Sequence, residues 1–245
     1  MDSVHILGLR VDRSDMPGAL ASIEQWIGQG DGPRHVVTAD ASMVVLAHGD
    51  PELARIVENA DLVTPDGAGI LWASKLLRSQ ITSKVSGVDL VSEMCRLSAQ
   101  HGYRLYFLGA APEVAAEAAR NLEARYPGAK IVGARDGYFK PEEENDVIQA
   151  IREASPDVLF VAFGIPKQEK WITRLKEELG VPVSLGIGGS FDVYSGRVKR
   201  APVWMQQHGL EWLYRLYSNP KKIAKVMTLP QFAIMTLRQR FLGAS

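Results

Sequence analysis

The chain has 245 residues, of which 46% are hydrophobic and 23% charged, which is ordinary composition for one large globular domain. Lys and Arg together number 28, as do Asp and Glu, so the net charge gives no indication of a nucleic-acid partner. No apolar run approaches the length of a membrane-spanning helix, and the first residues lack the charge and length of a signal peptide. We therefore expect a cytoplasmic protein, for which peripheral membrane association remains allowed.

Charge is distributed unevenly along the chain. Residues 201–245 contain six basic side chains and one acidic one, so this tail carries +5 and the preceding 200 residues carry −5. Such an asymmetry suggests an anionic partner for the tail. The single cysteine, Cys95, cannot form an intramolecular disulfide and lies in a helical pattern, so we expect it to be a core residue.

Strand and helix patterns alternate through the first 200 residues. Short apolar runs predict strands at 4–11, 34–39, 60–65, 103–109, 129–134, 157–164 and 181–189. Apolar and alanine positions three and four residues apart predict helices at 111–126, 142–154 and 167–179. The last two strands are almost wholly apolar, as is typical of central strands covered on both sides. The sequence thus predicts an α/β fold, Rossmann-like, with a mainly parallel sheet and helices on both faces.

The pattern changes after Gly196. Two or three helical segments follow with no further strand, and we expect Pro230 to kink or break the last helix. The chain therefore divides into an α/β core at 1–199 and a basic, amphipathic helical appendage at 200–245. Aromatic and basic residues interleave in this appendage, as they would on an anionic membrane surface. Packing of the appendage against the core explains the pattern equally well.

Ligands of doubly wound sheets bind at the carboxyl ends of the strands, and several such ends carry reactive or anion-binding residue types. The strings are TADAS at 38–42, TPDGAG at 64–69, GIPKQE at 164–169 and GIGGSFD at 186–192, with GAAP at 109–112 as a less informative fifth. Asp66 precedes a predicted helix. Its carboxylate either caps that helix or acts as a general base, and the two roles are compatible.

The glycine-rich string has two interpretations. Gly188 and Gly189 either let backbone amides approach a phosphate or form a tight strand-to-helix turn. Asp192, just beyond them, either binds a ribose or base edge or caps the next turn. Gln168 falls at a helix N-terminus, where anions bind, although an ordinary solvated turn fits the same string.

Several motifs are missing. The sequence contains no Asp-x-Asp, no Cys/His cluster with zinc spacing, no G-x-S-x-G, no Walker A sequence and no G-x-G-x-x-G. The five histidines are scattered singly, and a lone histidine is more often structural than a ligand. We therefore expect no metal site and no cofactor.

Eight strings, in order and at natural spacing, resemble the WecG/TagA/CpsF family of bacterial glycosyltransferases (glycosyltransferase family 26). They run from about Val36 to Lys225 and include VTADASMVVLA, ADLVTPDGAGILWASKLL, SPDVLFVAFGIPKQEKWI and GIGGSFDVYSGRVKRAPVWMQ. The resemblance implies transfer of a sugar, often of the N-acetylmannosamine type, from a UDP-sugar donor to a polyprenyl-diphosphate-linked acceptor. It also implies inversion without a metal, at the cytoplasmic face of the membrane, for cell-surface polysaccharide synthesis.

The resemblance also assigns roles to residues. Asp66 corresponds to the family's proposed base, and Arg215 to a cation that the appendage brings to the leaving diphosphate. Thr38 and Gln168 complete the catalytic candidates. The substrate-binding candidates, from the resemblance and the strand ends together, are Asp40, Lys84, Gly109, Tyr138, Gly188, Gly189, Asp192, Lys222 and Lys225.

Four positions depart from the family pattern. Asp40 stands where asparagine is usual, Lys84 where arginine is frequent, and Lys222 and Lys225 in place of two arginines. Lysine lacks the bidentate fork of arginine, so we expect weaker phosphate binding at the last two. Asp40 is expected to face a hydroxyl or a base donor, because phosphates would repel it. These departures leave the donor sugar and the acceptor open.

The expected partners are the UDP-sugar, the lipid-linked acceptor and, through the appendage, the membrane surface, but no nucleic acid. Self-association into a homo-oligomer is a further way to bury the apolar side of the appendage. Two other function classes remain as alternatives. One is a non-catalytic nucleotide-sugar binder, which the retained Asp66 disfavours. The other is a dinucleotide-dependent oxidoreductase, which the missing G-x-G-x-x-G disfavours.

Overall fold

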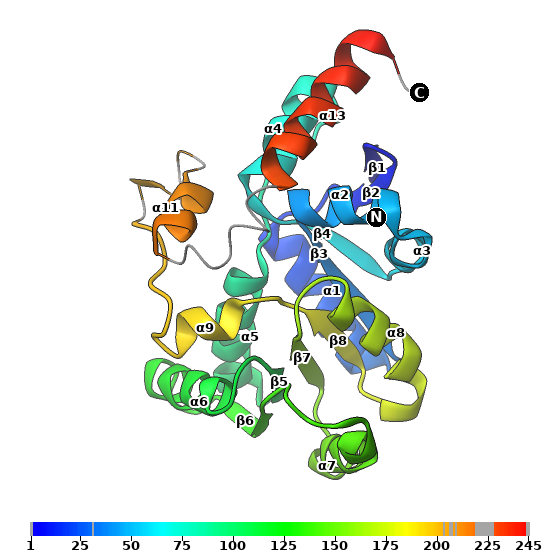
Figure 1. Ribbon diagram of the computed structural model, residues 1–245. Helices are drawn as coiled ribbons and strands as arrows, with labels where there is room; N and C mark the ends of the chain where they lie inside the picture. Colours follow the sequence, from blue (N-terminus) through cyan, green and yellow to red (C-terminus); the bar gives the residue numbers. More distant parts are fainter. Residues whose placement is uncertain are drawn as a thin grey trace.

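Six parallel strands form the central sheet of the protein, in the order β4-β3-β8-β7-β5-β6 (Figure 1). The computed structural model describes residues 2–30, 32–202, 204–205, 208, 210–218 and 228–243, with the backbone alone at 215–218. The strands are β3 (Arg34–Ala39), β4 (Leu62–Pro65), β5 (Arg104–Gly109), β6 (Lys130–Arg135), β7 (Val158–Ala162) and β8 (Val183–Gly186). This architecture confirms the predicted parallel α/β fold.

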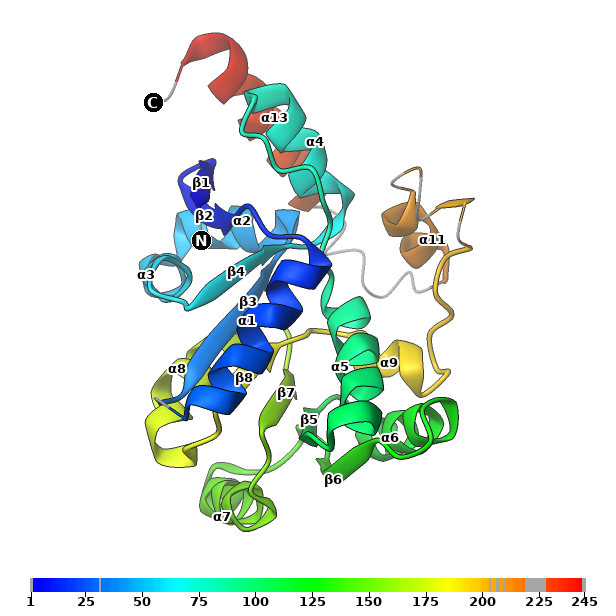
Figure 2. The ribbon, with the colours of Figure 1, turned by 180° about the vertical axis from the view of Figure 1, so that it is seen from behind.

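Helices cover both faces of the sheet (Figures 1 and 2). One face packs against α1 (Met16–Gln29), α5 (Gly87–His101) and α6 (Val114–Arg125). The other packs against α3 (Pro51–Glu58), α7 (Glu144–Ala154), which follows the short 3-10 helix η1 (Pro141–Glu143), and α8 (Lys167–Leu179). Every residue of β7 and β8 is buried, as expected for central strands. Cys95 lies in the core, where burial raises the pKa of its thiol to about 12.

An aromatic cluster fixes the glycine-rich string to the sheet. Phe191 lies in the short helix α9 (Ser190–Tyr194) and is fully buried. Its ring stacks on Phe107 of β5, with centroids 4.7 Å apart, and Phe107 meets Phe160 of β7 edge-on at 5.7 Å. Such contacts stabilise a core beyond the burial of area alone, so the string GGSF is held at the end of β8 by its own phenylalanine.

The predicted first strand is wrong in one respect, because residues 4–11 form a hairpin. Strands β1 (Ser3–Ile6) and β2 (Leu9–Asp12) pair antiparallel, apart from the main sheet. Leu7 and Gly8 connect them with φ angles of 53° and 79°. Two central residues with positive φ give the turn whose twist suits a hairpin. A leucine rarely adopts this conformation, which explains why the sequence pattern did not indicate a turn.

The hairpin covers the edge of the sheet at β4. The carboxylate of Asp12 is buried and accepts a hydrogen bond from the backbone N–H of Val63 in β4, at 2.8 Å. The guanidinium of Arg10 donates two hydrogen bonds of 3.0 Å to the same carboxylate. An edge strand otherwise presents unpaired N–H groups to other chains. Asp12 therefore pairs one backbone N–H of this edge strand and anchors the hairpin to it.

Two helices of the appendage are described, α11 (Glu211–Ser218) and α13 (Thr228–Leu242). Helix α13 packs against α2 (Ala41–Gly49) and α4 (Gly67–Leu77) through Phe232, which is 2% exposed. At Pro230, where we expected a kink or a break, α13 is not broken, because it is continuous from Thr228 to Leu242 with Pro230 in its first turn. A first-turn N–H has no intrahelical partner, so proline is tolerated there. No helix within the described ranges is long and apolar enough to cross a bilayer.

Candidate active site

The carboxyl ends of the parallel strands meet at one edge of the sheet and bring most of the candidate residues together. After β5 the chain continues into α6 on one face, and after β7 into α8 on the other. Ligands of such sheets bind where the chains leave neighbouring strands in opposite directions, and we call this place, between the ends of β5 and β7, the crevice. Gly109 ends β5 with a φ of 121°, and an added Cβ would lie 2.7 Å from the backbone of Ala162. Only glycine permits this close approach of the two strand ends.

Asp66 follows β4 and stands at the N-cap position of α4. Its side chain makes no capping hydrogen bond to that helix. Oδ2 accepts instead from the backbone N–H of Gly87, the first residue of α5, at 3.3 Å. The backbone N–H of Asp66 donates to the carbonyl of Ala39 at the end of β3, at 2.9 Å. Of the two roles that the sequence allowed, capping of α4 is not found.

The residues at the end of β3 make bonds within the protein. Thr38 is buried, and its hydroxyl donates to the carbonyl of Gly186 in β8 at 2.9 Å. This bond ties β3 and β8 together at the carboxyl edge of the sheet. Asp40 caps α2, because its Oδ1 accepts from the backbone N–H of Met43 at 2.9 Å. One oxygen of the Asp40 carboxylate is thus directed at helix amides.

Gln168 joins the loops that follow β7 and β8. It is 1% exposed, and its Oε1 accepts from the backbone N–H groups of Gly164, at 3.1 Å, and Gly188, at 3.0 Å. Its Nε2 donates to Oε1 of the buried Glu169 at 2.7 Å. The N–H of Gly188 is therefore bound within the protein. We call this set of three hydrogen bonds the Gln168 clamp.

The clamp depends on a glycine beneath it. A Cβ on Gly186 would lie 2.6 Å from Nε2 of Gln168 and 2.8 Å from Oε1 of Glu169. Gly189 precedes α9, and the half-buried Asp192 lies inside that helix. Tyr138 is 76% exposed in the segment after β6. The sequence located these strand ends correctly, but it did not indicate Gly186 or Glu169 as parts of the clamp.

The appendage is tied to the body near the start of α5. Arg200 Nη1 lies 2.7 Å from Oδ1 of Asp89 in α5. Burial raises the pKa of Asp89, but the hydrogen bonds from Arg200 and Ser86 and the charges of Arg200 and Lys84 together lower it by more, so the pKa lies below its ordinary value. Lys84, which precedes α5, lies 3.7 Å through its Nζ from Oε2 of Glu211 in α11. No sequence pattern indicated Arg200, Asp89 or Glu211, because such pairs join distant segments.

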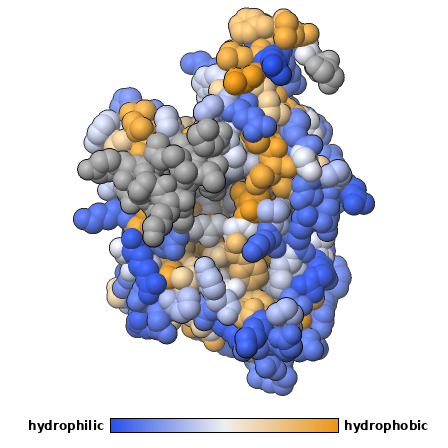
Figure 3. Space-filling model, in the orientation of Figure 1, coloured by the Kyte–Doolittle hydropathy of each residue, from blue (hydrophilic) through white to orange (hydrophobic). Residues whose placement is uncertain are grey.

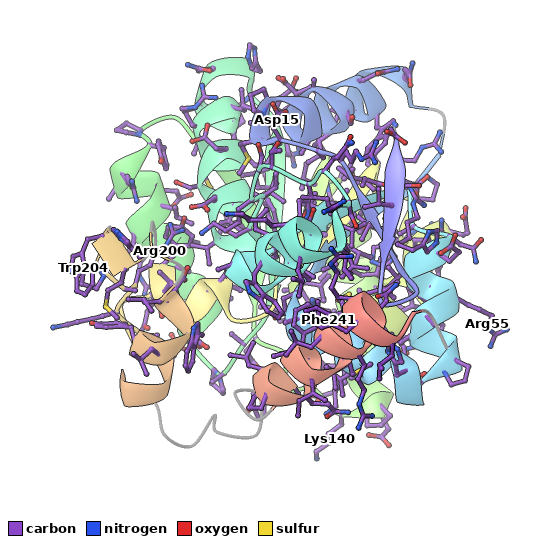
Figure 4. The ribbon with its side chains drawn as sticks, turned by 90° about the horizontal axis from the view of Figure 1, so that it is seen from above. Asp15, Arg55, Lys140, Arg200, Trp204 and Phe241 are labelled. Atoms are coloured by element: carbon purple, nitrogen blue, oxygen red, sulfur yellow. The ribbon has the colours of Figure 1, made fainter. Side chains whose placement is uncertain are left out.

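A cavity of about 580 Å³ lies between the appendage and the body. Helices α5, α6 and α9 form its walls together with Tyr214 of α11. Arg125, Lys199 and Arg200 contribute basic side chains to its lining. Seen from above, Arg200 and Trp204 lie together on this side of the molecule (Figure 4). Lys222 and Lys225 lie outside the described residues, as does the side chain of Arg215, whose backbone belongs to α11.

Apolar side chains are exposed where α13 and α4 project from the body. Figure 3 shows apolar surface at this projecting end. The exposed members are Trp72 of α4 and Ile234, Leu237, Phe241 and Leu242 of α13. We call this surface the α4/α13 apolar patch. Two arginines, Arg238 and Arg240, lie on α13 beside it, and α13 contains no acidic residue.

Comparison with known proteins places the site in a family. Residues 4–245 match the glycosyl transferase WecG/TagA/CpsF family. The N-acetylglucosaminyldiphosphoundecaprenol N-acetyl-beta-D-mannosaminyltransferase of Bacillus spizizenii is 36% identical over 203 residues, which cover 83% of this chain and 78% of that enzyme. The Bacillus subtilis enzyme of that name is 33% identical over 204 residues, with 83% and 79% covered.

The Staphylococcus aureus enzyme of the same name is 30% identical over 230 residues, which cover 94% of this chain and 90% of that enzyme. The match is therefore not confined to the sheet, but extends into the appendage. Both findings confirm the resemblance seen in the sequence strings. The chain belongs to the WecG/TagA/CpsF family and is a glycosyltransferase.

Proposed function

We propose that this enzyme is an inverting, metal-independent transferase that moves an N-acetylmannosamine-type sugar from a UDP-sugar to a polyprenyl-diphosphate-linked acceptor. The names of the three relatives support both the transferred sugar and the acceptor class. The observation that carries the proposal is the place of Asp66. Its carboxylate stands at the carboxyl edge of the sheet without capping the helix that follows it. A carboxylate in that place suits a general base.

The proposed reaction is a single displacement. Asp66 removes the proton from the acceptor hydroxyl, and that oxygen attacks the anomeric carbon from the face opposite UDP. The bond between this carbon and the diphosphate oxygen breaks, and UDP leaves with the electron pair. The new bond forms on the opposite face, so the anomeric configuration inverts.

The donor is proposed to lie across the crevice. Gly189, Asp192 and Tyr138 are proposed to contact the nucleotide, and Gly109 to line the crevice between β5 and β7. The Gln168 clamp acts as a positioning element, since its hydrogen bonds fix the loops at Gly164 and Gly188. Thr38 has the same kind of role through its bond to β8.

The leaving diphosphate needs positive charge as its bond breaks. Arg215, Lys222 and Lys225 of the appendage are proposed to supply it, together with Lys84. The ion pair between Lys84 and Glu211 supports this arrangement, because it joins α11 to the segment that leads into α5. Closure of the appendage over the crevice would also exclude water from the donor.

The enzyme is proposed to work at the cytoplasmic membrane face. A lipid-linked acceptor presents its sugar at that surface, and the α4/α13 apolar patch with Arg238 and Arg240 suits an anionic bilayer. Helix α4 begins directly after Asp66, so the same helix would connect the membrane contact to the proposed base.

Replacement of Asp66 by Asn tests the proposal. Asparagine keeps an acceptor oxygen for the N–H of Gly87 but cannot take a proton, so acceptor-dependent UDP release should fall about 10²- to 10⁴-fold. The dissociation constant for UDP should stay within about twofold. Asp146→Asn, on an exposed first turn of α7, is the matched control and should retain activity. Equal losses of UDP binding and of turnover in Asp66→Asn would show a structural role instead.

A further inference from the structure

A second cavity lies at the opposite end of β3 from the candidate active site. It has a volume of about 470 Å³ and is formed between α3 and α8, over the start of β3. His35, which lines it, is the second residue of β3, whereas Thr38 is the fifth. At about 3.3 Å per residue, their Cα atoms are about 10 Å apart along the strand. The volume is in the range of small-molecule sites.

A buried histidine at this cavity has an unpaired ring nitrogen. His35 is 3% exposed, and its Nε2 has no hydrogen-bond partner among the described residues. Its Nδ1 lies 3.4 Å from the hydroxyl of Thr173 in α8, and that hydroxyl can donate to it. When the hydroxyl donates, the ring hydrogen lies on Nε2. Buried polar groups are nearly always paired, so the unpaired Nε2 points to a missing partner, which is an acceptor when Nε2 carries the hydrogen.

The cavity is lined by more positive charge than its carboxylates neutralise. Lys170 is paired, because its Nζ lies 2.7 Å from both Asp50 and Glu52. Arg174 is paired as well, through two hydrogen bonds of 2.9 and 2.6 Å to Glu144. The positive charges of Lys170 and Arg174 are therefore largely neutralised by their carboxylate partners.

Two further cations of the lining are not neutralised in this way. Arg55 forms no ion pair with any described residue, and its Nε donates only to the carbonyl of Pro51, at 3.4 Å. Lys176 has one exposed carboxylate, that of Glu177, at 4.0 Å. In Figure 4, Arg55 lies at the rim of the molecule on the opposite side from Arg200. Helices α3 and α8 thus each contribute one cation whose charge remains available.

The charge state of His35 agrees with this field. Burial first, and then the charge of Lys176, lower its pKa to about 3, although Asp61 acts to raise it. The ring is therefore neutral at physiological pH and can donate from Nε2. The part of this shift that Lys176 causes reflects its positive charge near the ring, and that charge also attracts an anion.

We propose that this cavity binds a small phosphate-bearing anion, held by Nε2–H of His35 and by the side chains of Arg55 and Lys176. Inorganic phosphate and the phosphate group of a sugar monophosphate share this chemistry. Bound there, the anion would link α3 to α8, the helix whose first turn contains Gln168. The site is separate from the donor crevice, so the proposal does not depend on the proposed reaction.

The test uses the full chain labelled with ¹⁵N at histidine. The ring signals of His35, assigned with a His35→Gln variant, are followed during titration with inorganic phosphate or with glucose 6-phosphate, at constant ionic strength set with chloride. Parallel titrations contain saturating UDP. We expect a saturable shift of the His35 signals with a dissociation constant on the order of 1 mM, unchanged by UDP. Tighter binding of one ligand then identifies the source of the phosphate.

Two exposed arginines give a matched pair of variants. Arg55→Gln should weaken phosphate binding about 5- to 10-fold, as expected for the loss of one charge-assisted hydrogen bond. Arg152→Gln, in the last turn of α7, makes the same change of net charge and should leave the affinity within about twofold. The proposal is overturned if His35 shows no saturable shift up to about 50 mM phosphate. It is also overturned if the two variants weaken binding equally.

Discussion

Replacement of Gln168 by leucine tests the clamp between the loops that follow β7 and β8. Leucine nearly keeps the volume of the side chain but removes every polar atom. Two backbone N–H groups, of Gly164 and Gly188, and one carboxylate oxygen, of Glu169, lose their partner. A buried polar group left unpaired costs about 1–3 kcal/mol. Because both glycines are only half-buried and water can reach them, we expect a total loss of about 3 kcal/mol.

The assay compares two glutamine-to-leucine variants. For a chain of this size a loss of 3 kcal/mol lowers the melting temperature by roughly 6–12 °C. Gln149 supplies the matched control, because its Nε2 also donates to a glutamate one turn away, at 2.8 Å, but on an exposed face of α7. Gln149→Leu should cost less than about 0.5 kcal/mol.

The loss in Gln168→Leu should extend to ligand binding. Without the clamp the loop at Gly188 is no longer fixed to α8, so affinity for UDP in calorimetry should fall together with stability. Gln149→Leu should keep the wild-type affinity. Melting temperatures of the two variants within about 1 °C of each other would refute the reasoning, because the three hydrogen bonds would then contribute nothing beyond those of a surface pair.

Three further predictions concern stability and the membrane. Gly109→Ala forces a Cβ to within 2.7 Å of the Ala162 backbone at a positive φ, so chemical denaturation should show a loss above about 3 kcal/mol. The joint replacement of Phe241 and Leu242 by serine, at positions 74% and 80% exposed, should leave the melting temperature unchanged but reduce sedimentation with anionic vesicles; undiminished sedimentation would contradict the membrane proposal. His35 has a folded-state pKa of about 3, below its ordinary 6.5, so the unfolded chain takes up the proton first and stability falls as the pH drops from about 6.5 toward 3. At pH 5 this loss is on the order of 2 kcal/mol. The free energy of unfolding should therefore fall by about that much less in His35→Gln than in the exposed control His5→Gln when the pH is lowered from neutral to 5.

The sequence predicted the sheet well where burial on both faces leaves a clear pattern. Strands β7 and β8 are apolar throughout, and both lie in the middle of the sheet. The hairpin was missed because its turn uses a leucine at positive φ, which no composition rule favours. Helix α13 continues through Pro230 without a break because the effect of proline depends on its position in the helix, and that position became known only with the start of α13.

The candidate site was predicted in location but not in its bonds. Strand ends are local in sequence, so Asp66, Thr38 and Gln168 were identified from their strings. Their partners come from distant segments, as in the bond from Thr38 to Gly186 and that from Gly87 to Asp66. Residue spacing carries no record of such pairs, and for the same reason the unpaired nitrogen of His35 was visible only in the folded chain.

The most direct test of the proposed function measures UDP release from UDP-N-acetylmannosamine in EDTA, with and without a short-chain polyprenyl-diphosphate-linked N-acetylglucosamine. We predict release only when the acceptor is present, at the same rate with and without EDTA, and a product whose new linkage is inverted relative to the donor. Release that stops in EDTA and returns with a divalent cation would contradict the metal-independent mechanism. No release from any UDP-sugar, by a protein that still binds UDP, would contradict the proposed transfer itself.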